Sequence, residues 1–425
     1  MDKAASSGPR ERNSAQTRRD ILDAARTLFR HRGYAGTTVH SIAESLGLTD
    51  PAVYYHFHSK RQLWQALVDD VVVPTPPAAG IHSAEDLAQW LLAFFFAYAR
   101  HADVVAMLLR EQVGQDAASA NYREQAQSFY AAAAQEPLQR LYGDRAELLV
   151  TTMTTMLSGM FWDGILTFGT AFSNVATEPQ FRERVYRAIA LPLGLPRDAS
   201  MIGANPAGSW PKPGEAPERP GQAHHRRGRD ATRTRILQSA VELFSMNGVD
   251  GTSVRAIAEH CGLTDPAVYY YFPSKVALLD SLWEAQLDQP AADVAGSEPL
   301  TDAGLAAIVD ALIGSAANMD SQLRLLIRQV LAGDQVAITM RNDASAQWRA
   351  YLFASLSGTF DEVEATDRVD AILAASMGAV LLAQMGHPAD FPLFARSDDF
   401  RNELLAIVSA IVGVPESSGE RAETG

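Results

Sequence analysis

The sequence contains one cysteine, Cys261, so neither an internal disulfide nor a cysteine-based metal site can form. Long apolar runs are also missing: the uncharged stretches 148–162 and 371–385 are shorter than the ~18–20 residues that a membrane span needs. The N-terminal segment is polar and lacks the apolar core of a signal peptide. These absences predict a soluble, cytoplasmic protein without a membrane partner.

Catalytic signatures are missing too. The sequence has no phosphate-binding glycine loop, GxSxG, HExxH or paired-cysteine motif. His224 and His225 are adjacent but have no further metal-ligating residues near them, so they are interpreted as surface histidines. We therefore expect no enzymatic activity, no cofactor and no metal site.

Basic residues are outnumbered, and the formal net charge of −14 is unfavourable for binding nucleic acid. The charge is uneven, however. Residues 1–64 have an excess of about four basic side chains, and five arginines lie between Arg226 and Arg235. Such segments either present basic faces to phosphates or are simply solvated.

The two halves of the chain repeat each other. Residues 17–64 align without a gap with residues 232–279, and about 27 of 48 positions are identical. Weaker similarity continues to the ends of both halves, where residues 181–196 align with residues 400–415. A unit of about 200 residues is therefore duplicated in tandem.

Apolar residues recur at helical spacing in nearly all other segments, and no segment shows convincing strand alternation. The predicted fold is all-α, with a three-helix helix-turn-helix domain and a larger helical domain in each unit. The predicted boundaries are a disordered arm (1–16), a helix-turn-helix domain (17–64), a helical ligand-binding and dimerisation domain (65–196), a flexible linker (197–230), a second helix-turn-helix domain (231–279), a second helical domain (280–415) and a disordered tail (416–425).

The repeated phrase marks a short helix. It reads LTDPAVYYHFHSK from Leu48 and LTDPAVYYYFPSK from Leu263. Thr49 is a suitable N-cap, and Pro51 fits the first helical turn, where a missing N–H costs nothing. Lys60 lies in the first turn of the next helix, where its positive charge is unfavourable with respect to the helix dipole. A lysine at this position is favourable if a phosphate docks at the helix N-terminus.

A specific family resemblance rests on TTVHSIAESLGLTDPAVYYHFHSKRQL and TSVRAIAEHCGLTDPAVYYYFPSKVAL. Both stretches resemble the N-terminal domain of the TetR family of bacterial transcriptional regulators, over about a quarter of the chain. The resemblance implies that the third helix enters the major groove of double-stranded DNA and that the Ser-Lys step contacts the backbone. The residues expected to contact DNA are Thr38, His40, Thr49, Asp50, Pro51, Ala52, Tyr54, Tyr55, His56 and Lys60, with Ser253, Arg255, Thr264, Asp265, Pro266, Ala267, Tyr269, Tyr270, Tyr271 and Lys275 in the second copy.

Some of these roles have alternatives. Asp50 either accepts a hydrogen bond from a cytosine amino group or only favours the helix start. Tyr54 either reaches DNA or belongs mainly to the core. His40 aligns with Arg255, and because arginine grips guanine or phosphate more strongly, we expect unequal half-sites with tighter binding on the Arg255 side.

The resemblance also implies dimers that pair through the last two helices of the ligand domain, here about 148–168 with 179–192 and 367–385 with 398–412. Gly159 and Gly378 coincide in the repeat and are expected to allow close approach. The favoured arrangement is a covalent pseudo-dimer on a near-palindromic operator. The alternative is a further homodimer with four DNA-binding domains.

The first larger domain is richer in aromatic residues than the second. If one unit alone binds a small apolar effector, we expect it to be the first, although each of these residues also suits an ordinary core. Asp163 lies in an apolar helix, so its charge needs a partner, either a bound ligand or a residue across an interface. The predicted pocket residues are Phe94, Phe95, Tyr98, Met107, Met153, Trp162 and Asp163.

The predicted function is a ligand-responsive, sequence-specific transcriptional regulator, most simply a repressor. The alternative is an architectural or partner-binding protein associated with DNA that senses no small molecule.

Overall fold

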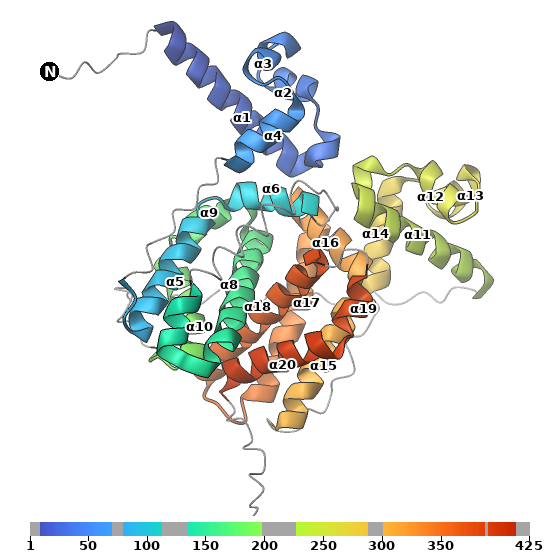
Figure 1. Cartoon of the computed structure of the whole chain (residues 1–425). Helices are drawn as coiled ribbons and strands as arrows, with labels where there is room; N and C mark the ends of the chain where they lie inside the picture. The colour runs from blue at the N-terminus through green and yellow to red at the C-terminus, as the bar shows by residue number, and fades with distance from the viewer. Residues whose placement is uncertain are drawn as a thin grey trace, which may run out of the picture.

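The computed structural model describes residues 9–69, 80–112, 134–197, 227–287, 301–386 and 390–413. Within these ranges every regular element is an α-helix or a short 3-10 helix, which confirms the predicted all-α fold (Figure 1). The helices form because apolar residues at helical spacing give each of them a face to bury against its neighbours.

The first helix-turn-helix domain consists of α1 (Pro9–Gly36), α2 (Val39–Ser45), α3 (Asp50–His56) and α4 (Lys60–Asp69). Helical geometry breaks at Gly33, whose φ of 74° favours glycine. Thr38 caps α2, because its hydroxyl oxygen accepts a hydrogen bond from the Ser41 amide at 3.0 Å. Val53 and Phe57 are buried, and they fix α3 to the small core of the domain.

The second helix-turn-helix domain has the same construction in α11 (Arg227–Gly251), α12 (Val254–His260), α13 (Asp265–Tyr271) and α14 (Lys275–Leu287). Gly248 breaks its first helix with a φ of 77°. Ser253 caps α12 by accepting a hydrogen bond from the Ala256 amide at 3.0 Å. Val268 and Phe272 are buried like their counterparts in the first copy.

The structure differs from two predicted boundaries. The predicted disordered arm ran to residue 16, but α1 begins at Pro9. The predicted linker ran to residue 230, but α11 begins at Arg227. Both helix starts are polar, so no apolar periodicity marks them in the sequence. The rest of the predicted arm, linker and tail, residues 1–8, 198–226 and 416–425, lies outside the described residues.

A larger helical domain follows each small one. The first contains α5 (Ala84–Ala99), α6 (Ala102–Gln112), the helical residues 134–142, η2 (Gly143–Arg145), α8 (Ala146–Phe168), η3 (Gly169–Ala171), α9 (Phe172–Val175) and α10 (Pro179–Leu193). The second contains α15 (Asp302–Asn318), α16 (Asp320–Ala332), α17 (Gln335–Leu356), α18 (Glu362–Gly386), α19 (Phe391–Ala395) and α20 (Asp398–Val412).

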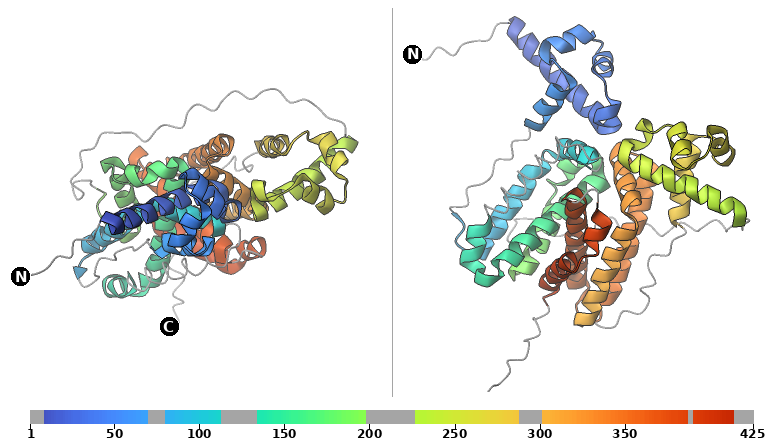
Figure 2. Two further views of the ribbon diagram at one scale, coloured as in Figure 1. Left: turned by 90° about the horizontal axis from the view of Figure 1, so that it is seen from above. Right: turned by 45° about the vertical axis from the view of Figure 1, so that its right-hand side comes forward.

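The two helix-turn-helix domains lie next to each other at one end of the molecule, beside a helical body (Figure 1). Figure 2 shows the same arrangement from two other directions. Helix α1 packs on α6 and α11 packs on α16, so each small domain rests on the larger domain of its own unit. The two units also meet here, because α1 contacts both α11 and α16.

The larger domains join where α8 of the first unit crosses α18 of the second, with α10 and α20 beside them. A Cβ atom added at Gly159 would lie 1.7 Å from the Ala374 carbonyl oxygen. One added at Gly378 would lie 1.8 Å from the Thr155 carbonyl oxygen. The predicted close approach at the two glycines is therefore confirmed, and it brings the helix backbones into direct contact.

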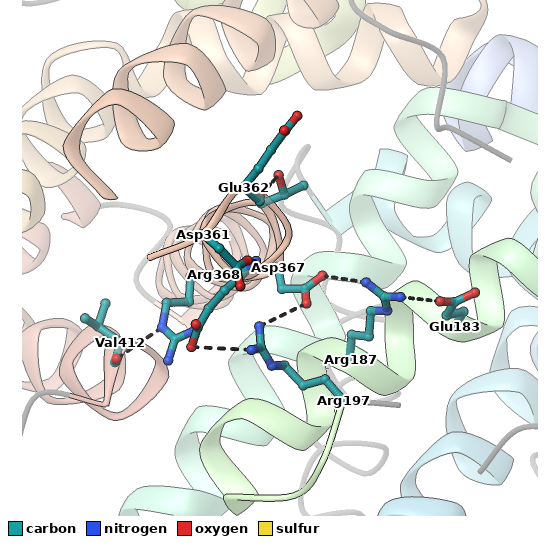
Figure 3. A network of polar contacts seen from close by, with 10 residues as sticks. Glu183, Arg187, Arg197, Asp361, Glu362, Asp367, Arg368 and Val412 are labelled. Carbon is teal, nitrogen blue, oxygen red and sulfur yellow. Dashed lines mark hydrogen bonds and ion pairs between the residues drawn. The ribbon is translucent and has the colours of Figure 1, made fainter. Parts of the chain in front are cut away.

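Ion pairs flank this crossing (Figure 3). Arg187 on α10 pairs with Glu183 one turn earlier and with Asp367 on α18 at 3.7 Å. Arg197, just after α10, lies 3.3 Å from Asp367 and 3.4 Å from Glu364. Burial raises the pKa of Asp367, and the two arginines partly offset that effect. The network connects the first unit to the start of α18.

Candidate nucleic-acid interface and cavity

The face of α3 that points away from the core is aromatic and polar. Tyr54 and Tyr55 are 46% and 78% exposed, and in the second copy Tyr269 and Tyr270 are 50% and 67% exposed. Tyr55 and Tyr270 make edge contacts with the neighbouring rings of His56 and Tyr271, and the hydroxyl groups of these exposed tyrosines suit contacts with phosphate. None of the twenty residues predicted to contact DNA is buried.

The N-cap residues of the second and third helices all carry hydroxyl groups, but only those of the second helices make cap hydrogen bonds. Thr38 and Ser253 use their oxygens to cap α2 and α12. Thr49 and Thr264 occupy the N-cap positions of α3 and α13 but make no side-chain cap hydrogen bond. The hydroxyl groups of Thr49 and Thr264 therefore remain available to an anion, whereas the amides of Ala52 and Ala267 donate to the carbonyl oxygens of these two threonines.

The second residue of the second helix is paired differently in the two copies. His40 Nδ1 lies 3.1 Å from Asp50 Oδ1, which links α2 to α3. Arg255 instead donates to Glu259 at 2.9 Å, one turn along α12, and this hydrogen bond raises the arginine pKa further. Both pairs are solvent-exposed, so phosphate can compete with the carboxylates for the His40 imidazole and the Arg255 guanidinium.

Lys60 has a structural role that its position in the sequence did not indicate. Its Nζ donates to the carbonyl oxygens of Tyr34 and Thr37 at 2.9 and 3.0 Å, and it lies 4.2 Å from the centre of the Tyr34 ring. Lys275 repeats this arrangement with Val249 and Thr252. The lysine thus holds the turn before α2, and a phosphate contact by it stays a prediction.

Two arginines that were not among the predicted contacts also lie beside the third helix. The guanidinium of Arg18 is 4.6 Å from the centre of the Phe57 ring, and that of Arg233 is 5.3 Å from Phe272. Both arginines occupy the same position of the repeat, which is the signal that identifies them. They add a cation to each helix-turn-helix surface.

A cavity of about 250 Å³ lies between the second larger domain and α8 and α10 of the first unit. Apolar side chains such as Leu326 of α16, Trp348 of α17 and Met377 of α18 form most of its wall. The first unit contributes Met160 and Leu166 from α8. Residues of both units therefore line one cavity.

Five charged residues on the wall of this cavity alternate in sign. Arg341 on α17 donates to Asp163 on α8, and Arg184 on α10 lies 3.9 Å from Asp163. Arg184 also donates to Asp370 on α18 at 2.6 Å, and Arg349 on α17 donates to Asp370 as well. Burial alone would raise the pKa of Asp370, but the two guanidinium groups bring it below its usual value.

Only Asp163 among the predicted pocket residues lies on this wall. It pairs with Arg341 across the units, which is the interface role left open by the sequence, while a ligand contact by Asp163 stays a prediction. The other six pack into cores: Phe95 and Tyr98 contact Phe161, and Met107 joins the core of the first helix-turn-helix domain. The other three are Phe94, Met153 and Trp162. A pocket in the first unit stays a prediction, because residues 113–133 lie outside the described ranges.

Neither a membrane-spanning helix nor a cluster of metal ligands is found in the described ranges. No helix there is both long and apolar enough to cross a membrane. The same residues contain no group of three His, Cys, Asp or Glu side chains arranged to hold a metal ion. The candidate sites are therefore the two helix-turn-helix surfaces and the cavity.

Comparison with known proteins finds one family at both helix-turn-helix domains. The model described as "Bacterial regulatory proteins, tetR family" matches residues 21–67 and 236–282. The tetracycline repressor protein class A from transposon 1721 of Escherichia coli is 34% identical over 157 residues, which cover 36% of this chain and 66% of that protein. The regulator TtgR of Pseudomonas putida is 46% identical over 56 residues, or 13% of this chain and 27% of its own length.

Two further similarities are weaker. The negative transcriptional regulator IcaR of Staphylococcus aureus is 32% identical over 83 residues, which cover 18% of this chain and 44% of IcaR. Among solved structures, Salmonella enterica GusR matches 43% of this chain and 96% of its own at 22% identity, with a TM-score of 0.31. The chain thus spans just under two thirds of the tetracycline repressor and smaller parts of TtgR and IcaR.

The family match falls on equivalent positions of the two halves, where the helices, the glycine breaks and the caps also coincide. The relatives that share these positions are transcriptional regulators rather than enzymes. Both helix-turn-helix domains therefore belong to the TetR family of bacterial regulatory proteins, and the chain carries two TetR-like units in tandem.

Proposed function

We propose that this chain is a ligand-responsive transcriptional repressor in the cytoplasm that binds a near-palindromic DNA operator as a covalent pseudo-dimer. The observation that carries the proposal is the presence of two exposed helix-turn-helix surfaces at one end of a single chain, joined through the α8–α18 crossing. Dimeric helix-turn-helix proteins read two half-sites about one helical turn of DNA apart. Here one chain supplies both readers.

On the DNA, α3 and α13 lie in successive major grooves. Tyr54 and Tyr55, with their second-copy counterparts, contact phosphates and fix the orientation of each helix. Asp50, Pro51 and Ala52 face base edges, where the Asp50 carboxylate accepts a hydrogen bond from a cytosine amino group and the apolar pair contacts a thymine methyl. The Arg255 half-site binds more tightly than the His40 half-site.

The pseudo-dimer is favoured over an assembly with four DNA-binding domains. The apolar faces of α8 and α10 are already covered by α18 and α20 of the same chain. A second chain pairing through these helices would have to displace both the Gly159–Gly378 contact and the ion pairs of Asp367. Linking the two halves also keeps their effective concentration at about the millimolar level.

A ligand in the cavity has a direct mechanical route to DNA binding. Helix α16 forms part of the cavity wall and packs on α11, while α17 contacts α14. Arg328 on α16 donates to the carbonyl oxygens of Ser245 and Met246 on α11, at 2.8 and 2.9 Å. An effector that binds better to a shifted position of α16 and α17 therefore moves the second reading helix and lowers operator affinity.

Selection of binding sites from a random DNA pool tests the proposal, at ~0.15 M salt where unspecific phosphate attraction is reduced. We expect a slightly imperfect palindrome to be enriched. Failure to enrich any sequence would contradict operator binding and favour the alternative of an architectural or partner-binding protein. A single half-site would show that the two copies do not read together.

A further inference from the structure

Two residues that line the cavity each contain a buried polar atom without a hydrogen-bond partner in the described part of the chain. These atoms are Nε of Arg341 and Oγ of Ser376, and their residues are only 8% and 4% exposed. A buried donor without a partner is costly, by more when it belongs to a charged group. Two such residues around one apolar cavity indicate a ligand that carries hydrogen-bond acceptors.

The charges on the wall add a second, independent indication. The row of alternating charges begins and ends with arginines, Arg341 and Arg349, which lie two turns apart on α17 and hence about 12 Å apart along its axis. Its two carboxylates, Asp163 and Asp370, leave one positive charge in excess. An excess cation beside an apolar cavity is stabilised by an anion, which it binds most strongly through paired hydrogen bonds.

We propose that the effector is an amphipathic anion, with an apolar body and one carboxylate head, that occupies this cavity. The inference rests on the proposed function and specifies the chemistry of its effector. The carboxylate accepts hydrogen bonds from Arg341 or from Arg349, the two ends of the row of charges, and Ser376 is a further donor among the lining residues. The apolar body lies against Leu326, Trp348 and neighbouring side chains. A cavity of about 250 Å³ is small for a ligand site, so the body is a single medium-length chain or ring system.

Binding of the anion also acts on the contact between the units. Arg341 donates to the Asp163 carboxylate on α8, so a ligand carboxylate competes with Asp163 for the same guanidinium. Release of Asp163 loosens α17 from the first unit, and α17 contacts α14 of the second helix-turn-helix domain. The effector site thus needs residues of both units.

The test uses the purified full-length chain and three probes of equal length: decanoate, decanol and decylammonium. Calorimetric titration is expected to give a dissociation constant for decanoate at least about tenfold below that for decanol, and the weakest binding for decylammonium. Decanol binding as tightly as decanoate, or no decanoate binding at millimolar concentration, would overturn the proposal.

Two variants test separately whether the carboxylate head binds at Arg349 or at Arg341. Arg349→Gln removes one anion partner while Asp370 keeps Arg184, and decanoate binding should weaken about tenfold if the head binds there. Asp163→Asn removes the competing carboxylate, and decanoate binding should tighten several-fold if the head binds at Arg341. If neither variant alters decanoate affinity relative to decanol, the charged row does not bind the head and the proposal is wrong.

Operator binding without ligand is measured on the same protein preparation. Operator binding together with equal affinity for decanoate and decanol refutes the effector chemistry alone. A preference for decanoate in a chain that binds no operator refutes the proposed repressor and leaves the effector chemistry standing.

Discussion

Substitution of Gly159 by alanine tests the contact between the two units directly. The added Cβ would lie 1.7 Å from the Ala374 carbonyl oxygen, so α8 and α18 must separate by more than 1 Å to reach a normal contact of about 3.3 Å. Forcing a packed interface apart costs about 3 kcal/mol, while replacing a helical glycine by alanine gains about 1 kcal/mol. We expect the free energy of unfolding, measured by urea denaturation, to fall by about 2 kcal/mol.

Gly314→Ala is the matched control. Gly314 lies in the helical interior of α15, and a Cβ added there meets no atom within 4 Å. Only the gain in helix propensity applies, so this variant should be more stable than the wild type by about 1 kcal/mol. Gly378→Ala should behave like Gly159→Ala, and the double variant should cost less than the sum of the two because both push the same helices apart. A Gly159→Ala protein as stable as Gly314→Ala would refute the close crossing.

Three further predictions concern DNA binding, acid stability and coupling. Arg255→Ala should weaken operator binding about tenfold, and by more than His40→Ala does, because arginine binds guanine or phosphate more strongly than neutral histidine; equal losses in a gel-shift titration of operator variants would disprove the asymmetry. The pKa of Asp370 is lowered in the folded chain, so its contribution to stability is present above pH ~4 and is lost as the pH falls through the lowered value. Asp370→Asn should therefore be about 3 kcal/mol less stable at neutral pH, and the difference from wild type should shrink in acid; a difference that does not change with pH would contradict this. Arg328→Met removes the hydrogen bonds from α16 to α11, and the operator affinity of this variant should respond less to the effector than that of the wild type; an unchanged response would exclude Arg328 from the coupling.

Features that depend on neighbouring residues, or that the internal repeat marks, can be predicted from the sequence. The caps at Thr38 and Ser253 and the breaks at Gly33 and Gly248 depend on a few neighbouring residues. The close approach at Gly159 was predictable because a second glycine occupies the same place in the repeat and both helices are apolar on more than one face.

Features that depend on distant segments were not predictable in the same way. The sequence placed Lys60 at a helix start, but its hydrogen bonds go to a turn 23 and 26 residues earlier. The partners of Asp163 are Arg184 and Arg341, and the second of these lies 178 residues away in the other unit. The cavity forms where helices of both units meet, so the aromatic content of one unit did not indicate its position.

The mass of the chain bound to its selected operator tests the central claim most directly. Light scattering or native mass spectrometry of the complex is expected to give one 46.0 kDa chain on each two-half-site operator, with both half-sites protected from cleavage. Two chains on each operator, or protection of one half-site only, would contradict the account that one chain reads the operator as a pseudo-dimer.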